Sequence, residues 1–308
     1  LFEAKMEGFE FKQELKKDGD LVKTYTTPVG TVTEVFKTNP KAKEQGLSFE
    51  AGQVEYMIKG KNDYKTVEYI IEHTTYHPTY EEFIAYEKEI GEDGIPMIYS
   101  YYDPMFRILH DYIGYNQAYF ELMDNQEEVE RLYEIKWAKN RELQEVLVKS
   151  PSRIILHGAH FDSMMTPPPV FDKYMKPYYQ DFTSKLHDAG KILSVHADAN
   201  SKLLLKSFLD SGIDMVECFC TAPMVPVTME EALDAWGDKM IIWGGIPSNV
   251  MVPTSTSYDD FVSYVNKLFD VFRRKGGRVI LGIADNVMPE ADIGRVEKVT
   301  ELVEKFQY

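Results

Sequence analysis

Histidine and acidic side chains recur where this sequence predicts that buried β-strands end. His196 and Asp198 close the apolar segment Ile192–Ala197. Glu217 lies in the next apolar segment, Asp214–Phe219. Alternate residues of a strand point to the same side of a sheet, so the side chains of His196 and Asp198 are expected to converge. Glu217 is expected to point into the same region from the neighbouring strand.

Imidazole and carboxylate groups in this pattern indicate metal chemistry. A histidine with two acids is a nitrogen and oxygen ligand set suited to Zn²⁺ with an open position for catalysis. We therefore expect His196, Asp198 and Glu217 to bind a metal, with His196 and Asp198 acting in catalysis. In a chain with 7 histidines and 50 acidic residues the spacing alone arises by chance, so the position at strand ends carries this prediction. The alternative is that His196 is a hydrogen-bonded core residue or a general acid.

A second group of polar residues follows the apolar segment Arg153–Ala159. His157 and His160 have the spacing H-x-x-H at a strand end, which lacks the one-face geometry of an i, i+4 pair on a helix. They are expected to contact substrate or to serve the structure. Asp162 is predicted to take part in catalysis, as an acid that supports the metal ligands or organises substrate protons.

Aromatic and sulfur-bearing side chains accompany these groups. Tyr99, Tyr101 and Trp243 are predicted to form aromatic walls for a planar substrate, with ordinary packing as the alternative in a chain of 20 tyrosines. Cys218 and Cys220 are the two cysteines of the chain. They form C-x-C, a possible thiolate pair, but one strand rarely directs both toward an ion that other residues already bind, and on a regular strand Cys218 has the opposite parity to Glu217. Both cysteines are therefore expected to be buried and inert.

Apolar segments that alternate with amphipathic helical segments must position these residues. From Ile95 onward this alternation predicts repeated βα units around a parallel sheet. The predicted strands are Pro96–Tyr101, Arg153–Ala159, Ile192–Ala197, Asp214–Phe219, Lys239–Gly244 and Arg278–Ile283. The predicted helices are Gln126–Leu147, Val170–Asp188 with a kink at Pro177, Ser201–Leu209, Thr228–Trp236, Tyr258–Arg274 and Ile293–Phe306.

The residues before Ile95 predict a mixed extension. Thr24–Phe36 is rich in β-branched and aromatic residues and is interrupted at Pro28-Val29-Gly30, which predicts a β-hairpin. Asp63–Tyr69 and Thr79–Ile90 predict two helices. The whole chain is expected to be a single α/β domain, a (β/α)₈ TIM-type barrel formed by residues 95–308, with the hairpin and helices of residues 1–94 as its extension. An open doubly wound sheet is disfavoured, because no glycine-rich phosphate-binding loop follows any predicted strand.

Composition and charge exclude several classes of function. The chain has 34 basic and 50 acidic residues, and its formal charge of −16 argues against a nucleic-acid or anionic-membrane partner. No apolar run approaches the roughly 18 residues of a membrane span. Two cysteines so close together do not favour a disulfide, and a cytoplasmic protein is expected. The chain opens at Leu1 without methionine, so a preceding native stretch is expected to be missing.

Four segments resemble the uroporphyrinogen decarboxylase superfamily. They are His196–Asn200, the loop and helix 167–190, Trp243–Pro247 and Gly282–Glu290. The resemblance covers most of residues 24–308 and implies a (β/α)₈ barrel. The superfamily includes zinc-dependent, corrinoid-linked methyltransferases, and the hairpin Thr27–Thr31 is similar to members that demethylate methoxylated aromatics. The resemblance therefore implies that zinc assists transfer of a methyl group from a small donor to a corrinoid carried by a partner protein.

The sequence departs from the thiolate-type methyltransferases at two positions. Those enzymes carry His-x-Cys and a later cysteine before the final helix, whereas Asp198 and Asp285 occupy the corresponding positions here. The comparison implies a zinc site of nitrogen and oxygen ligands, built from His196 with Asp198, Glu217 or Asp285.

Two other functions stay open. The decarboxylase itself acts on a polycarboxylate, but none of the eight arginines of this chain lies at the carboxyl end of a predicted strand, and an acidic mouth would repel a polyanion. One alternative is a cofactor-free decarboxylase or related lyase, in which Asp198 or Asp162 organises substrate protons and His196 serves as the acid. The other is a barrel without catalytic activity that binds a corrinoid partner or a small ligand.

Overall fold

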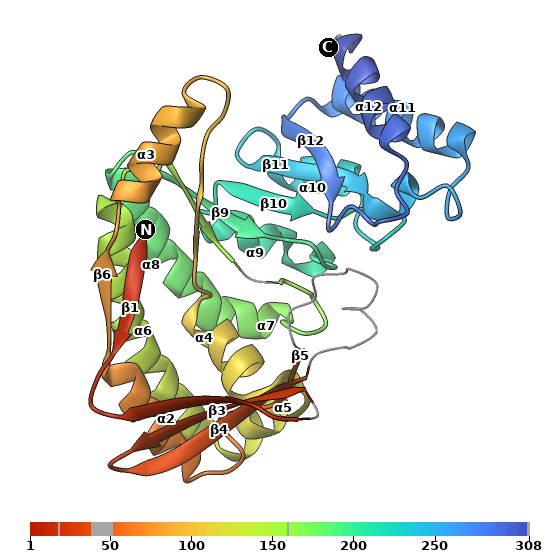
Figure 1. Ribbon diagram of the computed structural model, residues 1–308. Coiled ribbons are helices and arrows are strands. Elements are labelled where there is room, and N and C mark those ends of the chain that lie inside the picture. The colour runs from red at the N-terminus through yellow and green to blue at the C-terminus, as the bar shows by residue number, and fades with distance from the viewer. Residues whose placement is uncertain (18, 38–51, 159, 307–308) are drawn as a thin grey trace. The chain divides into compact units, whose positions relative to one another are not determined.

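The chain of 308 residues folds into two compact units. The structure is a computed structural model and describes residues 1–17, 19–37, 52–158 and 160–306. The N-terminal unit comprises Leu1–Gly94 and Tyr102–Pro151, and the C-terminal unit comprises Ile95–Tyr101 and Ser152–Tyr308 (Figure 1). The change in sequence character near residue 95 thus lies at a structural boundary, although the chain returns to the N-terminal unit for residues 102–151.

Two antiparallel sheets belong to the N-terminal unit. The larger has the strand order β2-β3-β4-β5, and β1 pairs with β6 in a separate ladder. The strands are β1 (Phe2–Met6), β2 (Glu10–Leu15), β3 (Asp20–Thr27), β4 (Gly30–Lys37), β5 (Gly52–Glu55) and β6 (Thr74–Pro78). The predicted hairpin is confirmed, since Thr27 pairs with Gly30 at the turn between β3 and β4. Thr27 Oγ1 donates to the Gly30 carbonyl at 2.9 Å and accepts from the Val29 N–H at 3.2 Å, which closes the turn.

The helices of the N-terminal unit include both predicted ones. They are α2 (Asp63–Glu72), α3 (Glu81–Ile90), α4 (Pro104–Arg107), the π-helical η1 (Ile108–Ile113), α5 (Tyr115–Asp124) and α6 (Gln126–Lys149). Helix α3 ends at Gly91, whose φ of 58° suits a residue without a side chain. Helix α6 packs on α2, and its buried side chains include Val129 and Leu132.

A six-stranded parallel sheet forms the centre of the C-terminal unit, with the order β12-β11-β10-β9-β8-β7. Its strands are β7 (Ile98–Ser100), β8 (Ile154–His157), β9 (Ile192–His196), β10 (Met215–Phe219), β11 (Ile241–Pro247) and β12 (Arg278–Ala284). All six predicted strands are confirmed. Ala159, the expected last residue of one of them, lies outside the described residues.

The predicted α/β class with a parallel sheet is confirmed, but closure into an eight-stranded barrel is not seen. Within the described residues the sheet ends at β7 and at β12. Strand β7 has only three residues, and Ile280 in β12 is 48% exposed, as expected at a sheet edge.

Helices follow the strands of the C-terminal unit as predicted. They are α7 (Pro168–Val170), the π-helical η2 (Phe171–Met175), α8 (Lys176–Asp188), the 3₁₀ turn η3 (Lys202–Leu204), α9 (Leu205–Asp210), α10 (Met229–Trp236), the 3₁₀ turn η4 (Ser248–Met251), α11 (Tyr258–Lys275) and α12 (Ile293–Glu304). The predicted helix Val170–Asp188 is divided before Pro177, which lies in the first turn of α8, where its missing N–H has no partner to lose. None of the described helices combines the length and the apolar composition needed to cross a membrane.

Candidate metal and catalytic site

Strands β9 and β10 bring an imidazole and a carboxylate together. The two strands run parallel, and His196 lies opposite Glu217 in their register. His196 Nδ1 is 2.5 Å from Glu217 Oε2, and His196 Nε2 is 3.4 Å from Asp198 Oδ2. The structure thus places Asp198 and Glu217 on the two nitrogen sides of one histidine ring.

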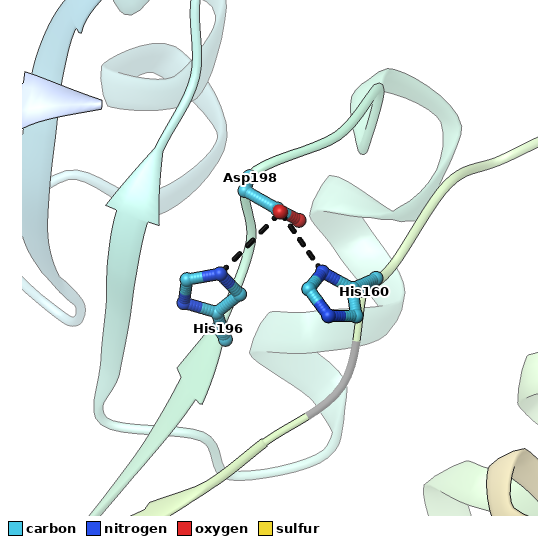
Figure 2. A group of neighbouring side chains, drawn as sticks. All are labelled: His160, His196 and Asp198. Atoms are coloured by element: carbon cyan, nitrogen blue, oxygen red, sulfur yellow. Dashed lines mark hydrogen bonds and ion pairs between the residues drawn. The ribbon is translucent and has the colours of Figure 1, made fainter. Parts of the chain in front are cut away.

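Asp198 also binds His160, which follows strand β8. His160 Nδ1 lies 2.8 Å from Asp198 Oδ2, and the rings of His160 and His196 stand nearly perpendicular, with centroids 5.2 Å apart (Figure 2). His160 is exposed, with 51% of its side chain open to solvent, so the group opens to the surface. The four residues form a continuous polar chain in the order His160, Asp198, His196 and Glu217.

A buried serine holds the two loops of this site together. Both the N–H and the Oγ of Ser163 donate to the Asn200 carbonyl at 2.7 Å, and Ser163 Oγ accepts from the Leu203 N–H at 3.1 Å. Because Ser163 lies in the loop after β8 and Asn200 in the loop after β9, these bonds fix His160 beside Asp198. Asp162 caps the same loop, since its Oδ1 accepts the Met164 N–H at 2.7 Å. The contacts of Asp162 therefore orient the loop, and its carboxylate is outside the ligand groups described below.

The charges in this group stabilise one another. Burial on its own lowers the pKa of His196, but the hydrogen bonds and charges of Asp198 and Glu217 outweigh burial and raise that pKa to about 9. Burial on its own raises the pKa of Asp198, but the hydrogen bonds from His160 and His196 hold it well below its usual range. In the metal-free protein His196 is therefore protonated at neutral pH. A cation that binds its ring must displace that proton.

Cys218 points where the sequence does not predict. Strand β10 shifts its register against β11 between Val216 and Phe219, and Cys218 has a φ of +58°. This irregularity interrupts the alternation of a regular strand, and Cys218 Sγ lies within 4.8 Å of ligand atoms of both His196 and Glu217. The prediction of opposite parity is therefore wrong. The expectation that both cysteines are buried is confirmed for Cys218 and for Cys220.

Two groups of potential ligands result, and both contain His196. One consists of His160, His196 and Asp198, and the other of His196, Glu217 and Cys218. In each group the ligand atoms lie within 4.8 Å of one another. Asp285 was predicted as a further ligand, but its carboxylate belongs to neither group. Its backbone N–H instead donates to Cys218 Sγ at 2.8 Å.

His157 lies in the interior of the C-terminal unit. Its side chain is fully buried, its Nδ1 binds Ser100 Oγ at 2.7 Å, and its Nε2 binds Tyr178 Oη at 3.1 Å. With both ring nitrogens occupied, His157 joins β7, β8 and α8, which fits the structural alternative and not the contact with substrate.

The three predicted wall residues differ in exposure. Tyr99 is 59% exposed and Tyr101 is 37% exposed, whereas Trp243 is half-buried. The Tyr99 ring lies across Gly158, where an added Cβ would come within 2.7 Å of it, so this ring flanks the segment that leads to His160. The Trp243 indole lies against Gly282, where an added Cβ would be 3.2 Å from Nε1.

Comparison with known proteins identifies the family. A profile of the family described as uroporphyrinogen decarboxylase (URO-D) matches residues 111–306, which is more than half of the chain. The chain belongs to the uroporphyrinogen decarboxylase family. No curated protein matches the sequence.

Two solved structures were superposed on this chain. A methyltransferase from Methanosarcina mazei superposes with a TM-score of 0.55 at 11% identity, over 84% of this chain and 73% of that chain. D-psicose 3-epimerase superposes with a TM-score of 0.36 at 11% identity, over 73% of this chain and 92% of that chain, which is too weak to support an argument. At such low identity the first likeness shows a shared fold.

The donor set of this uroporphyrinogen decarboxylase family member fits a divalent metal ion. Imidazole, carboxylate and thiolate are the protein ligands of Zn²⁺. Asp198 Oδ1 is buried and has no hydrogen-bond partner among the described residues, an arrangement that costs free energy unless a cation or water completes it. The sequence does not predict that Cys218 lies beside His196, because a bulge leaves no mark in the pattern of apolar residues.

Proposed function

We propose that this protein is a zinc-dependent methyltransferase that moves a methyl group from a small methoxylated aromatic donor to a corrinoid carried by a separate protein. The observation that carries the proposal is the group of His196, Asp198 and Glu217 at the carboxyl ends of β9 and β10. Membership of the uroporphyrinogen decarboxylase family and the shared fold with a methyltransferase support it.

The ligand groups define what the chain's residues contribute. His196, together with the neighbouring Asp198 or Glu217, holds the ion. When bound, the ion would supply Lewis-acid chemistry at the ether oxygen of the donor, which would make the phenolate a better leaving group as the methyl group passes to cobalt. The exposed rings of Tyr99 and Tyr101, with Trp243, supply aromatic walls that orient a planar donor.

Charge favours a donor that carries little negative charge. The chain has a formal charge of −16, and Asp198 and Glu217 add local negative charge at the site. A polycarboxylate would be repelled, whereas a neutral methoxyarene would not. The one buried arginine among the described residues, Arg295, donates to the backbone carbonyls of Val250 and Thr256 and is thereby engaged in structure.

The test is methyl transfer from methoxyarenes to reduced cobalamin, measured together with the metal content of the purified protein. We expect the wild type to contain about one metal ion per chain, and His196→Ala to lose both the ion and methyl transfer. His187→Ala is the matched control, because His187 also pairs with an aspartate, Asp214, at 2.9 Å, but outside both ligand groups. Metal-free wild-type protein with transfer unchanged in His196→Ala would refute the proposal.

A cofactor-free lyase is the second candidate. The polar chain from His160 to Glu217 favours it, because the raised pKa of His196, about 9, keeps the imidazole protonated at neutral pH and able to act as an acid. The experiment is decarboxylation of uroporphyrinogen after exhaustive chelation. Undiminished release of carbon dioxide would support the lyase, and absence of release with and without metal would exclude decarboxylation of uroporphyrinogen.

A further inference from the structure

We infer that Cys218 is a thiolate ligand of the metal, and that the ion lies on the Nδ1 side of His196, held by His196, Glu217 and Cys218. This inference rests on the metal dependence of the proposed function and adds to it a ligand and a position. It also changes the expected site from nitrogen and oxygen ligands to a mixed set that includes sulfur.

The first support is the geometry of the three ligand atoms. One atom each from His196, Glu217 and Cys218 lies within 4.8 Å of the other two. His196 Nδ1 and Glu217 Oε2 are 2.5 Å apart, a hydrogen-bonded contact that would widen by about 1 Å when both atoms bind one ion at roughly 2.0–2.2 Å. Imidazole, carboxylate and thiolate together form a three-ligand set that leaves a fourth position on Zn²⁺ for a substrate oxygen.

The second support is the backbone conformation at Cys218, which positions its sulfur. Cys218 with φ +58° and Asp285 with φ +62° are the non-glycine residues with positive φ in the described part of the chain. Such conformations cost free energy, and the two residues contact each other directly. The register shift lies at Cys218, whose sulfur is within 4.8 Å of ligand atoms of His196 and Glu217.

The third support is the hydrogen bond to sulfur. The Asp285 N–H donates to Cys218 Sγ at 2.8 Å. Backbone N–H groups that point at a sulfur stabilise the charge of a metal-bound thiolate. Burial raises the pKa of the Cys218 thiol to about 12 in the metal-free protein. A divalent cation reverses this, since a coordinating thiol is deprotonated outright, and the proton passes to solvent.

The fourth support is the environment of the second ring nitrogen of His196, Nε2. Its Nε2 faces Asp198, and Asp198 is held by His160 at 2.8 Å. Metal-binding histidines commonly donate their second ring N–H to a carboxylate, which fixes the tautomer and the orientation of the ring. On this arrangement Asp198 and His160 are positioning residues, the ion binds at the other nitrogen, and a water molecule completes the buried Asp198 Oδ1.

The experiment is titration of the metal-free full chain with Co²⁺, followed by absorption spectroscopy. A cobalt–thiolate bond gives a charge-transfer band in the near ultraviolet, and nitrogen or oxygen ligands do not. We expect the band in the wild type, its loss in Cys218→Ser with about 100-fold weaker Co²⁺ binding or worse, and its retention in Cys220→Ser. Cys220 is the matched control, because it is also buried and lies two residues away, but belongs to neither ligand group. Circular dichroism of each variant establishes that it is folded.

Asp198→Asn distinguishes the role of the residue at Nε2 of His196 from that of the ligands at Nδ1. We expect it to keep the charge-transfer band and to bind Co²⁺ about 10- to 100-fold more weakly, as for loss of a residue that orients a ligand. Bound Co²⁺ without the band in the wild type, or no Co²⁺ binding at all, would overturn the inference. Methyl transfer is assayed on the same samples: transfer without the band refutes the inference alone, and the band without transfer refutes the proposed function alone.

Discussion

His196 has two carboxylates on opposite sides of one ring. Glu217 lies 2.5 Å from Nδ1 and Asp198 lies 3.4 Å from Nε2. A neutral imidazole has one donor nitrogen and one acceptor nitrogen, so it can bind an ion through one nitrogen while the N–H of the other donates a hydrogen bond. The two carboxylates must therefore have different roles, one beside the ion and the other holding the ring.

Glu217→Gln and Asp285→Asn test these roles at two acids with different surroundings. We expect Glu217→Gln to weaken Co²⁺ binding by about 100-fold or more, because it removes a charged ligand. We expect Asp285→Asn to bind Co²⁺ within a few-fold of the wild type, because its carboxylate is in neither ligand group. Asparagine also tolerates the positive φ of this residue and keeps the N–H that donates to Cys218. Equal losses in both variants would show that the Asp285 carboxylate binds the ion.

Sequence reasoning reached part of this site because alternation along a regular strand is a reliable rule. It placed His196 and Asp198 on one face and directed Glu217 toward them, and in the structure these three side chains meet. Cys218 escaped the same rule because the strand is irregular at that residue. The partners of His157, Ser100 and Tyr178, come from 57 and 21 positions away, and no local pattern reveals them.

At the scale of elements, the bulge in β10 depends on a glycine in the neighbouring strand. Gly244 in β11 has a φ of +139°, and an added Cβ would lie 2.6 Å from the Phe219 backbone nitrogen. Only a residue without a side chain lets the two backbones approach this closely. The position of the Cys218 sulfur is therefore determined partly by a residue 26 positions later in the sequence.

Gly244→Ala tests this dependence. The added methyl group must displace backbone atoms of β10, so we expect a loss of about 1–3 kcal/mol in the free energy of unfolding and a weakened cobalt–thiolate band. Gly190→Ala is the control, since its φ is also positive, at +70°, but nothing lies within 4 Å of the added Cβ. We expect the control to cost about 1–2 kcal/mol through backbone strain and to leave the band intact. Urea unfolding and the Co²⁺ spectrum measure the two effects, and an unchanged band in Gly244→Ala would contradict the argument.

At the scale of the whole molecule, the strands were predictable, but closure of the sheet was not. Alternating apolar and amphipathic segments identify each strand from its own residues. Closure instead depends on which strands pair at the two ends of the sheet, and β7 and β12 remain its edges within the described residues. The return of residues 102–151 to the N-terminal unit is likewise a matter of long-range packing.

The stability of the molecule should depend on pH through a buried lysine. Lys136 in α6 is only 5% exposed, and burial, with the nearby charges of Arg107 and Lys139, lowers its pKa to about 7 against a partial opposing effect of Asp111. Between about pH 7 and pH 10 the unfolded chain holds a proton at this lysine that the folded chain lacks. The free energy of unfolding therefore rises with pH in this window, and the cost of burying the charge is fully present below pH 7.

Lys136→Met should remove that cost. We expect it to stabilise the protein by about 1–4 kcal/mol at pH 6 and by clearly less at pH 9, because the wild-type lysine is mostly neutral in the fold at the higher pH. Lys149→Met, on the same helix but with its side chain 72% exposed, should change the free energy of unfolding by less than about 0.5 kcal/mol at both pH values. Urea unfolding of the wild type and the two variants at pH 6 and pH 9 measures these differences in the free energy of unfolding. A gain from Lys136→Met that is the same at pH 6 and pH 9 would mean that Lys136 keeps its proton in the folded protein up to pH 9, so that its pKa is not lowered and the benefit comes from packing alone.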